Sequence, residues 1–249
     1  MIDTHCHIYR EYYDNIDEEI SKILASGVEK IIVNGCDMKS NLEVLSLVKR
    51  YDCVYGALGF QPTELSGNDD DNINWLATHI NDKKIVAIGE IGLDYHYDDT
   101  DKERQIYMFK KQLDLAVKYN KPIIVHTRDA IKDTYDILSV YKLKGSIHAY
   151  SGSLEMAKLF TKLGYYIGIG GVATFKNAKN IVEVIKEINL EYLLLETDSP
   201  YLTPEPFRGQ TNTPANIPII AKKISEIKEI SYDKVVFETT KNANELFDF

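Results

Sequence analysis

The sequence predicts an α/β protein, a (β/α)8 TIM barrel. Eight short β-rich runs alternate with amphipathic stretches, and this alternation implies parallel strands joined by crossovers. No glycine-rich dinucleotide loop follows the first run, which argues against the competing doubly wound open sheet. We expect residues 1–249 to form a single barrel domain, because barrels of about 250 residues are common.

The expected strands are short and rich in apolar residues. The fourth, IVAIGE, and the fifth, PIIVH, are apolar almost to their last residue. The eight runs lie, in chain order, at 1–5, 30–34, 53–58, 85–90, 122–126, 146–148, 165–168 and 192–196.

Amphipathic stretches separate these strands. In the stretch at 102–119, Met108, Phe109 and Leu113 recur at helical spacing and share one side. The expected helices lie at 17–26, 40–50, 71–81, 102–119, 129–142, 154–163, 178–189 and 214–230, and a last helix at 232–246 closes the chain.

Composition excludes several classes of protein. Apolar residues make up 44% and charged residues 27%, so collagen-like and wholly disordered chains are excluded. No run is long enough to span a membrane and no signal peptide is visible, so we expect no membrane association and a cytoplasmic location. Cys6, Cys36 and Cys53 form no CxxC pair and are expected to be reduced thiols.

The formal net charge of −9 sets a condition on any anionic substrate. Proteins that hold nucleic acid through basic patches alone are usually basic. If the substrate is a polyanion, bound metal cations would have to attract it.

Histidines and carboxylates gather at the ends of the expected strands. His5 and His7 form an HxH pair, and alternation along a strand puts both rings on one face. Taken singly, such residues have structural explanations: a salt bridge for Glu90, or a turn or cap for Asp198. The full set is His5, His7, Glu90, His126, His148 and Asp198.

These six positions lie at the ends of strands 1, 4, 5, 6 and 8, which converge on one mouth of a closed barrel. Four imidazoles and two carboxylates match the mixed ligand set of a two-metal hydrolytic site. Two divalent cations with two carboxylates would leave a local charge of about +2, which would attract an anionic substrate to an acidic protein.

Two arginines are candidates for substrate binding. Arg128 follows His126 by two positions, and Arg208 lies in a proline-rich loop after the last strand, in which Thr213 and Pro214 suit a helix N-cap and first residue. A guanidinium can hold phosphate oxygens bidentately. A solvated surface charge is the alternative for each arginine.

Other polar residues near the mouth have less specific explanations. Glu196 could tune the metal site or be structural. Asp94 could lie behind a metal ligand or form a turn, and the turn is favoured. His96 could meet the substrate, but a solvated loop position is favoured. Tyr97 and Tyr201 lie near the mouth, where their rings could stack on bases.

The motifs THCH, GEIGLDY, PIIVHTRDA, HAYSG and ETDSPYLTP, followed by RGQTNTP, resemble the ordered signatures of the TatD-related metal-dependent deoxyribonucleases. The resemblance runs from about residue 1 to 247. It implies a TIM barrel of the metal-dependent hydrolase type that cleaves phosphodiester bonds in DNA, often as an exonuclease on single strands.

The resemblance also assigns roles to the candidate ligands. By motif match, His5, His7 and Asp198 would hold one metal ion. His126 and His148 would hold the other, and Glu90 would bridge the two.

Two positions depart from the family pattern. Gln61 stands in GFQPTE where the family usually has histidine, and an amide cannot act as an imidazole ligand. Tyr150, in HAYSG rather than HCFSG, keeps an aromatic ring that could pack or stack a base.

We therefore expect a divalent-metal-dependent phosphodiester hydrolase with a DNA substrate. In this mechanism Glu90 and Asp198 are catalytic as well as metal-binding. We expect two divalent metal ions, which could be Mg²⁺, Mn²⁺ or Zn²⁺, and no organic cofactor. The alternatives are an amidohydrolase acting on a cyclic amide or ester, and a catalytically silent DNA-binding protein.

Overall fold

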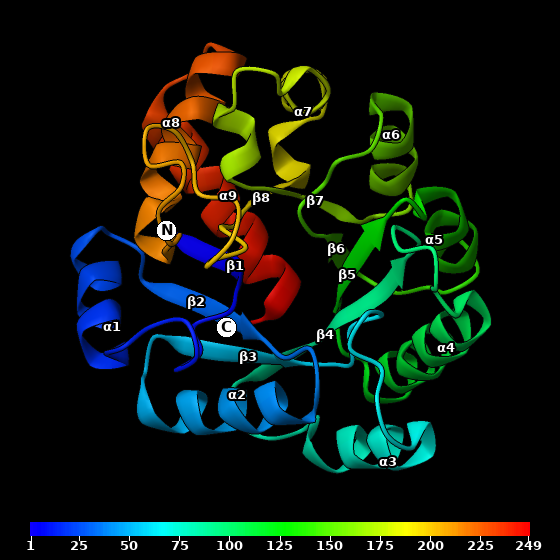
Figure 1. Cartoon of the computed structure of the whole chain (residues 1–249). Helices are drawn as coiled ribbons and strands as arrows, with labels where there is room; N and C mark the ends of the chain where they lie inside the picture. Colours follow the sequence, from blue (N-terminus) through cyan, green and yellow to red (C-terminus); the bar gives the residue numbers. More distant parts are fainter.

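The eight strands form one parallel sheet in the order β1 to β8, surrounded by helices (Figure 1), in a computed structural model that describes residues 1–249. This confirms the predicted (β/α)8 barrel. The strands are β1 (Ile2–Cys6), β2 (Lys30–Asn34), β3 (Val54–Leu58), β4 (Ile85–Asp94), β5 (Ile123–Arg128), β6 (Gly145–Ile147), β7 (Tyr166–Ile169) and β8 (Leu193–Leu195).

Helices follow the strands as predicted, with small shifts at their ends. Side-chain caps set several starts; for example, Asn15 accepts a hydrogen bond from the Glu18 amide at the start of the first helix. No helix is long and apolar enough to cross a membrane. The helices are α1 (Ile16–Ala25), α2 (Met38–Arg50), α3 (Asp69–His79), α4 (Lys102–Tyr119), α5 (Ile131–Leu138), α6 (Leu154–Lys162), α7 (Lys179–Glu187), α8 (Ile217–Lys228) and α9 (Tyr232–Phe247).

The helix expected at 214–230 begins differently from the prediction. Thr213 caps a short 3-10 helix, η3 (Pro214–Asn216), by accepting a hydrogen bond from the Ala215 amide at 3.2 Å. The α-helix starts only at Ile217. There are two further 3-10 segments: η1 (Gly171–Thr174) follows β7, and η2 (Leu190–Tyr192) directly precedes β8.

Strand β4 is longer than predicted, and its extension shapes the mouth. The strand continues past Glu90, where Gly92 pairs with His126 and Asp94 pairs with Arg128 of β5. Gly92 has φ of +148°, and a Cβ there would lie 1.9 Å from the His126 carbonyl oxygen. Glycine therefore permits the close approach of β4 to β5 beside the mouth.

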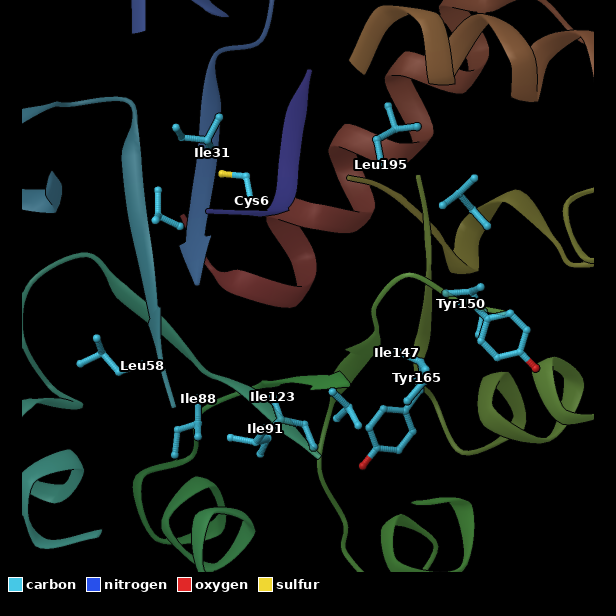
Figure 2. Close-up of a cluster of buried hydrophobic side chains, with 14 of the residues drawn as sticks. Cys6, Ile31, Leu58, Ile88, Ile91, Ile123, Ile147, Tyr150, Tyr165 and Leu195 are labelled. Atoms are coloured by element: carbon cyan, nitrogen blue, oxygen red, sulfur yellow. The ribbon is translucent and has the colours of Figure 1, made fainter. Parts of the chain in front are cut away.

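The apolar core has two parts. The larger part lies mainly between the strands and the surrounding helices; Figure 2 shows some of its members, including Ile31, Ile88 and Ile147. The smaller part combines residues such as Ile2 with Leu246 and Phe247 of α9. The last helix thus packs against the barrel and helps to form its floor, at the end opposite the carboxyl termini of the strands.

The barrel closes between β1 and the segment that leaves β8. The buried Asp3 carboxylate accepts hydrogen bonds from the His5 amide at 3.1 Å, the Thr197 amide at 3.1 Å and the Thr197 hydroxyl at 2.5 Å. Further along, the His7 amide donates to the Ser199 carbonyl at 2.7 Å. These contacts form a seam between β1 and the chain after β8, and the seam continues beyond the three residues of β8 itself.

Alanine substitutions at two glycines test how much the close contact between β4 and β5 contributes to stability. We expect Gly92→Ala to lower the free energy of unfolding by about 3 kcal/mol or more, because it adds both backbone strain and a clash. Gly164→Ala is the matched control: φ there is +91°, but nothing lies within 4 Å of the added carbon. It should cost only about 1–2 kcal/mol. Equal losses for the two variants in urea unfolding would show that the close approach is unimportant.

Candidate metal centre

Six polar side chains converge at the carboxyl ends of the strands. Their exposed fractions run only from 0% for His5 to 17% for His126, so the cluster is shielded from solvent. The members come from β1, β4 and β5 and from the residues just after β1, β6 and β8: His5, His7, Glu90, His126, His148 and Asp198. These are the residues that the sequence placed at strand ends.

The first group of ligand atoms surrounds the two histidines of β1 and its exit. The Nε2 atoms of His5 and His7 lie 3.1 Å apart. Glu90 Oε2 lies 3.4 Å from the first of these atoms and 3.6 Å from the second. Asp198 Oδ1 lies 3.6 Å and 3.4 Å from the same two nitrogens.

The second group uses the other oxygen of the same glutamate. Glu90 Oε1 lies 2.9 Å from His126 Nδ1 and 3.0 Å from His148 Nε2. These two nitrogens are 3.2 Å apart. Glu90 therefore lies between two histidine pairs and presents one oxygen to each.

The histidines are oriented in two different ways. His7 Nδ1 donates to the Asn34 carbonyl at 3.0 Å, and His126 Nε2 lies 2.9 Å from Asp94 Oδ2. The rings of His5 and His148 instead stack at 3.8 Å, and their Nδ1 atoms have no hydrogen-bond partner. One imidazole of each pair is thus fixed by a hydrogen bond on its far side, an arrangement common in metal-ligating histidines.

The convergence of acceptor atoms fits divalent cations. His7 donates through Nδ1, so its Nε2 faces the Glu90 and Asp198 oxygens. Burial opposes protonation of His7, but Cys36 and Asp198 raise its pKa well above the usual value, so without metal a proton occupies Nε2 in the place a cation would take. Lone pairs this close need protons or cations between them. Three groups of these residues hold their ligand atoms within 4.8 Å of one another, and two of those groups share Glu90. The donor set, imidazole with carboxylate, suits divalent metals.

The charges of the ligands support the same interpretation. Burial opposes ionisation of Glu90, but the neighbouring His148, with hydrogen bonds from His126 and His148, holds its pKa well below the usual value. Burial likewise opposes ionisation of Asp198, but the neighbouring His7, His148 and His5 together lower that pKa. Burial, reinforced by His148, lowers the pKa of His5 to about 4, so this imidazole is neutral at neutral pH.

A cavity of about 790 Å³ opens above the cluster. Arg128 and Tyr97 line it together, with the guanidinium carbon 5.9 Å from the ring centroid. Gln61 also lines it, but its side-chain oxygen accepts hydrogen bonds from the amide and hydroxyl of Thr63. Arg208 does not line this cavity, and its guanidinium lies over the Phe175 ring at 3.8 Å.

Asp94 fills both of the roles expected for it: its Oδ1 accepts a hydrogen bond from the His96 amide at 3.0 Å, as in an Asx-turn, and its Oδ2 faces His126. It is the last residue of β4, is 2% exposed, and contacts His126. The alternation of apolar residues continues through IGLD, and this was the signal that the strand runs on. His96, in contrast, lies in the loop as expected, partly exposed and paired with Asp129 at 2.9 Å.

Two other residues near the centre do not join the ligand cluster. Glu196 is buried, burial raises its pKa well above the usual value, and its carboxyl group accepts a hydrogen bond from the Ala149 amide. Tyr150 is buried in the core (Figure 2), and its hydroxyl donates to the Ser153 carbonyl at 2.7 Å. Packing is thus the role of Tyr150, and the suggestion that it stacks a base is wrong.

Sequence reasoning missed one neighbour of the cluster. Cys36 Sγ lies 3.6 Å from Glu90 Oε2 and 3.8 Å from His7 Nδ1. Its position two residues after the end of β2 was the available signal, since strand ends converge at the mouth.

Known proteins resemble this one along nearly the whole chain. The family model described as TatD related DNase matches residues 2–248. YabD of Bacillus subtilis (strain 168), described as an uncharacterized metal-dependent hydrolase, is 39% identical over 251 residues, which are 99% of this chain and 98% of the relative. A metal-dependent hydrolase of Methanocaldococcus jannaschii is 36% identical over 249 residues, 99% of this chain and 96% of the relative. The crystal structure of YjjV, a TatD homologue from Escherichia coli K12, has a TM-score of 0.95 at 33% identity and covers 100% of this chain and 98% of its own.

The contact between Asp94 and His126 leads to a prediction about metal affinity. Asp94→Asn removes the charge behind one imidazole and should weaken binding of a divalent ion roughly 10- to 100-fold, because such outer partners orient the ring and raise its basicity. Isothermal titration of the metal-free protein with Zn²⁺ or Mn²⁺ measures this. The matched control is Asp133→Asn, which changes an exposed carboxylate bonded to Tyr95. Unchanged affinity in Asp94→Asn would show that Asp94 does not support the ligand.

Proposed function

The chain belongs to the TatD-related DNase family of metal-dependent hydrolases, and from this premise we propose that it hydrolyses phosphodiester bonds in DNA, releasing nucleotides from single strands with the help of two divalent cations. The proposal covers both the substrate and the number of ions. Mg²⁺, Mn²⁺ and Zn²⁺ are the candidate ions, with no organic cofactor, and the cytoplasmic location stays a prediction.

One observation carries the proposal: the two oxygens of Glu90 face different histidine pairs. A carboxylate placed in this way can hold two cations at once, one beside His5 and His7 and the other beside His126 and His148. Two cations are well suited to a phosphodiester because the attacking and leaving oxygens both carry negative charge.

The chemistry divides between the cations and the chain. When bound, divalent cations would polarise a phosphoryl oxygen and lower the pKa of a water molecule. Asp198 is 16% exposed and lines the cavity, and its lowered pKa keeps it ionised, so its carboxylate is suited to orient the attacking water as a hydrogen-bond acceptor. Arg128 lines the same cavity and would hold a phosphate oxygen beside the reacting centre.

A direct assay tests the proposal. The protein is freed of metal with a chelator, reloaded separately with Mg²⁺, Mn²⁺ and Zn²⁺, and incubated with single-stranded DNA labelled at either end. Metal-dependent release of mononucleotides is the expected result. A panel of cyclic amides and esters is run in parallel, and turnover of these without DNA cleavage under any metal would favour the amidohydrolase alternative. Metal binding with neither activity would favour a silent binding protein.

Substituting the shared carboxylate should remove both ions. We expect Glu90→Gln to lose bound metal and at least about 100-fold in kcat/KM, since an amide has no negative charge to bridge two cations. Metal content by emission spectroscopy and the DNA assay measure the two effects, and circular dichroism checks the fold. Glu183→Gln, on the exposed face of α7, is the control. Near-normal metal content and turnover in Glu90→Gln would show that Glu90 is structural.

The two arginines should differ in their effects. Arg128→Ala should lower kcat/KM for DNA roughly 10- to 150-fold, through loss of a charge-assisted phosphate contact, while metal content stays unchanged. Lysine at position 128 should restore only part of the rate. The phosphate contact of Arg208 also stays a prediction, and Arg208→Ala measured in parallel decides it. If Arg128→Ala cleaves as well as the unmodified protein, this account of substrate holding is wrong.

A further inference from the structure

Two tyrosines from distant parts of the chain meet at the rim of the cavity. Tyr12 lies in the loop after β1 and Tyr201 in the loop after β8, and their hydroxyls are 2.9 Å apart. Their rings meet edge to face, with centroids 5.9 Å apart. Even so, Tyr12 is 36% exposed and Tyr201 is 51% exposed. The pair is therefore fixed in position while its ring surfaces stay open to solvent.

The pair is connected to the metal centre on the side of His7 and Asp198. The ring of Tyr9 lies between, with its centroid 5.7 Å from that of His7 and 6.1 Å from that of Tyr12. The Tyr201 amide donates to the Asp198 carbonyl at 2.9 Å. All five residues line the same cavity. A group bound against the tyrosine pair would thus lie beside the reacting phosphate.

Charge distinguishes this side of the cavity from the opposite side. Lys39 and Arg128 are the only lysine or arginine side chains in the cavity lining. Lys39 is paired with Glu11 at 2.7 Å, whereas Arg128 makes no salt bridge and lies over Tyr97 on the other side. The Tyr12 side therefore offers apolar ring surface without a free cation, which suits a planar, uncharged group rather than a phosphate.

We propose that Tyr12 and Tyr201 form a stacking site for the nucleobase adjacent to the scissile phosphate. The inference rests on the proposed phosphodiesterase function and specifies which part of the substrate is recognised. A base can stack here only when it is unpaired and has left its neighbours, so the site selects single-stranded ends. Because every base has a π-face, the site does not read sequence.

The test compares single-stranded DNA with the same strands carrying an abasic tetrahydrofuran residue at one of the two positions flanking the cleaved bond. The unmodified protein should cleave the complete strand roughly 5- to 150-fold faster, the range expected for one stacked base. Tyr201→Leu and Tyr12→Leu should lose most of this preference by slowing cleavage of the complete strand alone. Tyr201→Phe keeps the ring and should keep the preference. Tyr107→Leu, an exposed tyrosine of α4 outside the cavity, is the control and should match the unmodified protein.

A binding measurement separates this inference from the proposed function. A strand with phosphorothioate linkages and 2-aminopurine as its terminal base is titrated with metal-loaded protein, and stacking quenches the aminopurine fluorescence. Quenching that is lost in Tyr201→Leu but kept in Tyr201→Phe supports the site even if no DNA is cleaved, in which case only the proposed function fails. Equal cleavage of complete and abasic strands, or equal quenching in Tyr201→Leu and Tyr107→Leu, overturns the stacking site while leaving the phosphodiesterase proposal intact.

Discussion

The centre depends on one seam, where β1 meets the segment that leaves β8. Three donors converge on the buried Asp3 carboxylate, and the Asp198 amide donates to the His5 carbonyl at 2.9 Å across the same join. His5 and His7 stand on one side of this seam and Asp198 on the other. If the seam opened, it would separate these ligands of the first group from one another. The hydrogen bonds that close the fold are therefore the same ones that assemble half of the metal centre.

The ligand cluster is a buried network in which protonated histidines and ionised carboxylates stabilise one another when no metal is bound. Nitrogen and oxygen atoms lie 3.1 to 3.6 Å apart in a buried setting. Neighbouring groups raise the pKa of His7 and of His126 against the effect of burial, so protons on these rings occupy part of the space that cations would take. The surrounding structure holds the cluster in place by two means: hydrogen bonds behind His7 and His126, and ring stacking of His5 on His148. Cations that bind this assembled cluster and not the unfolded chain would replace its protons and add to the stability of the fold, so metal binding and folding are coupled.

The sequence was sufficient to predict the barrel and the convergence of the candidate ligands, because both follow from the position of residues along parallel strands. His126 and Glu90 end apolar runs, and the geometry of a closed barrel brings such ends together. The sequence was not sufficient to predict contacts that depend on the conformation of the loops. The Tyr12–Tyr201 pair joins two loops 189 positions apart, and no periodicity relates them. The contact of Asp94 with His126 was given less weight than a turn, because the end of the strand was placed four residues early.

The packing at the floor of the barrel determines when β1 can complete its contacts during translation. Ile2 belongs to the same buried cluster as Leu246 and Phe247, so the first strand completes its packing only against the last helix. During synthesis the nascent chain carries β1 with one unpaired edge until β8 and α9 have left the ribosome. Exposed strand edges are templates for association with other chains. Covering this edge is therefore among the last steps open to the growing chain, because β8 and α9 lie near its end.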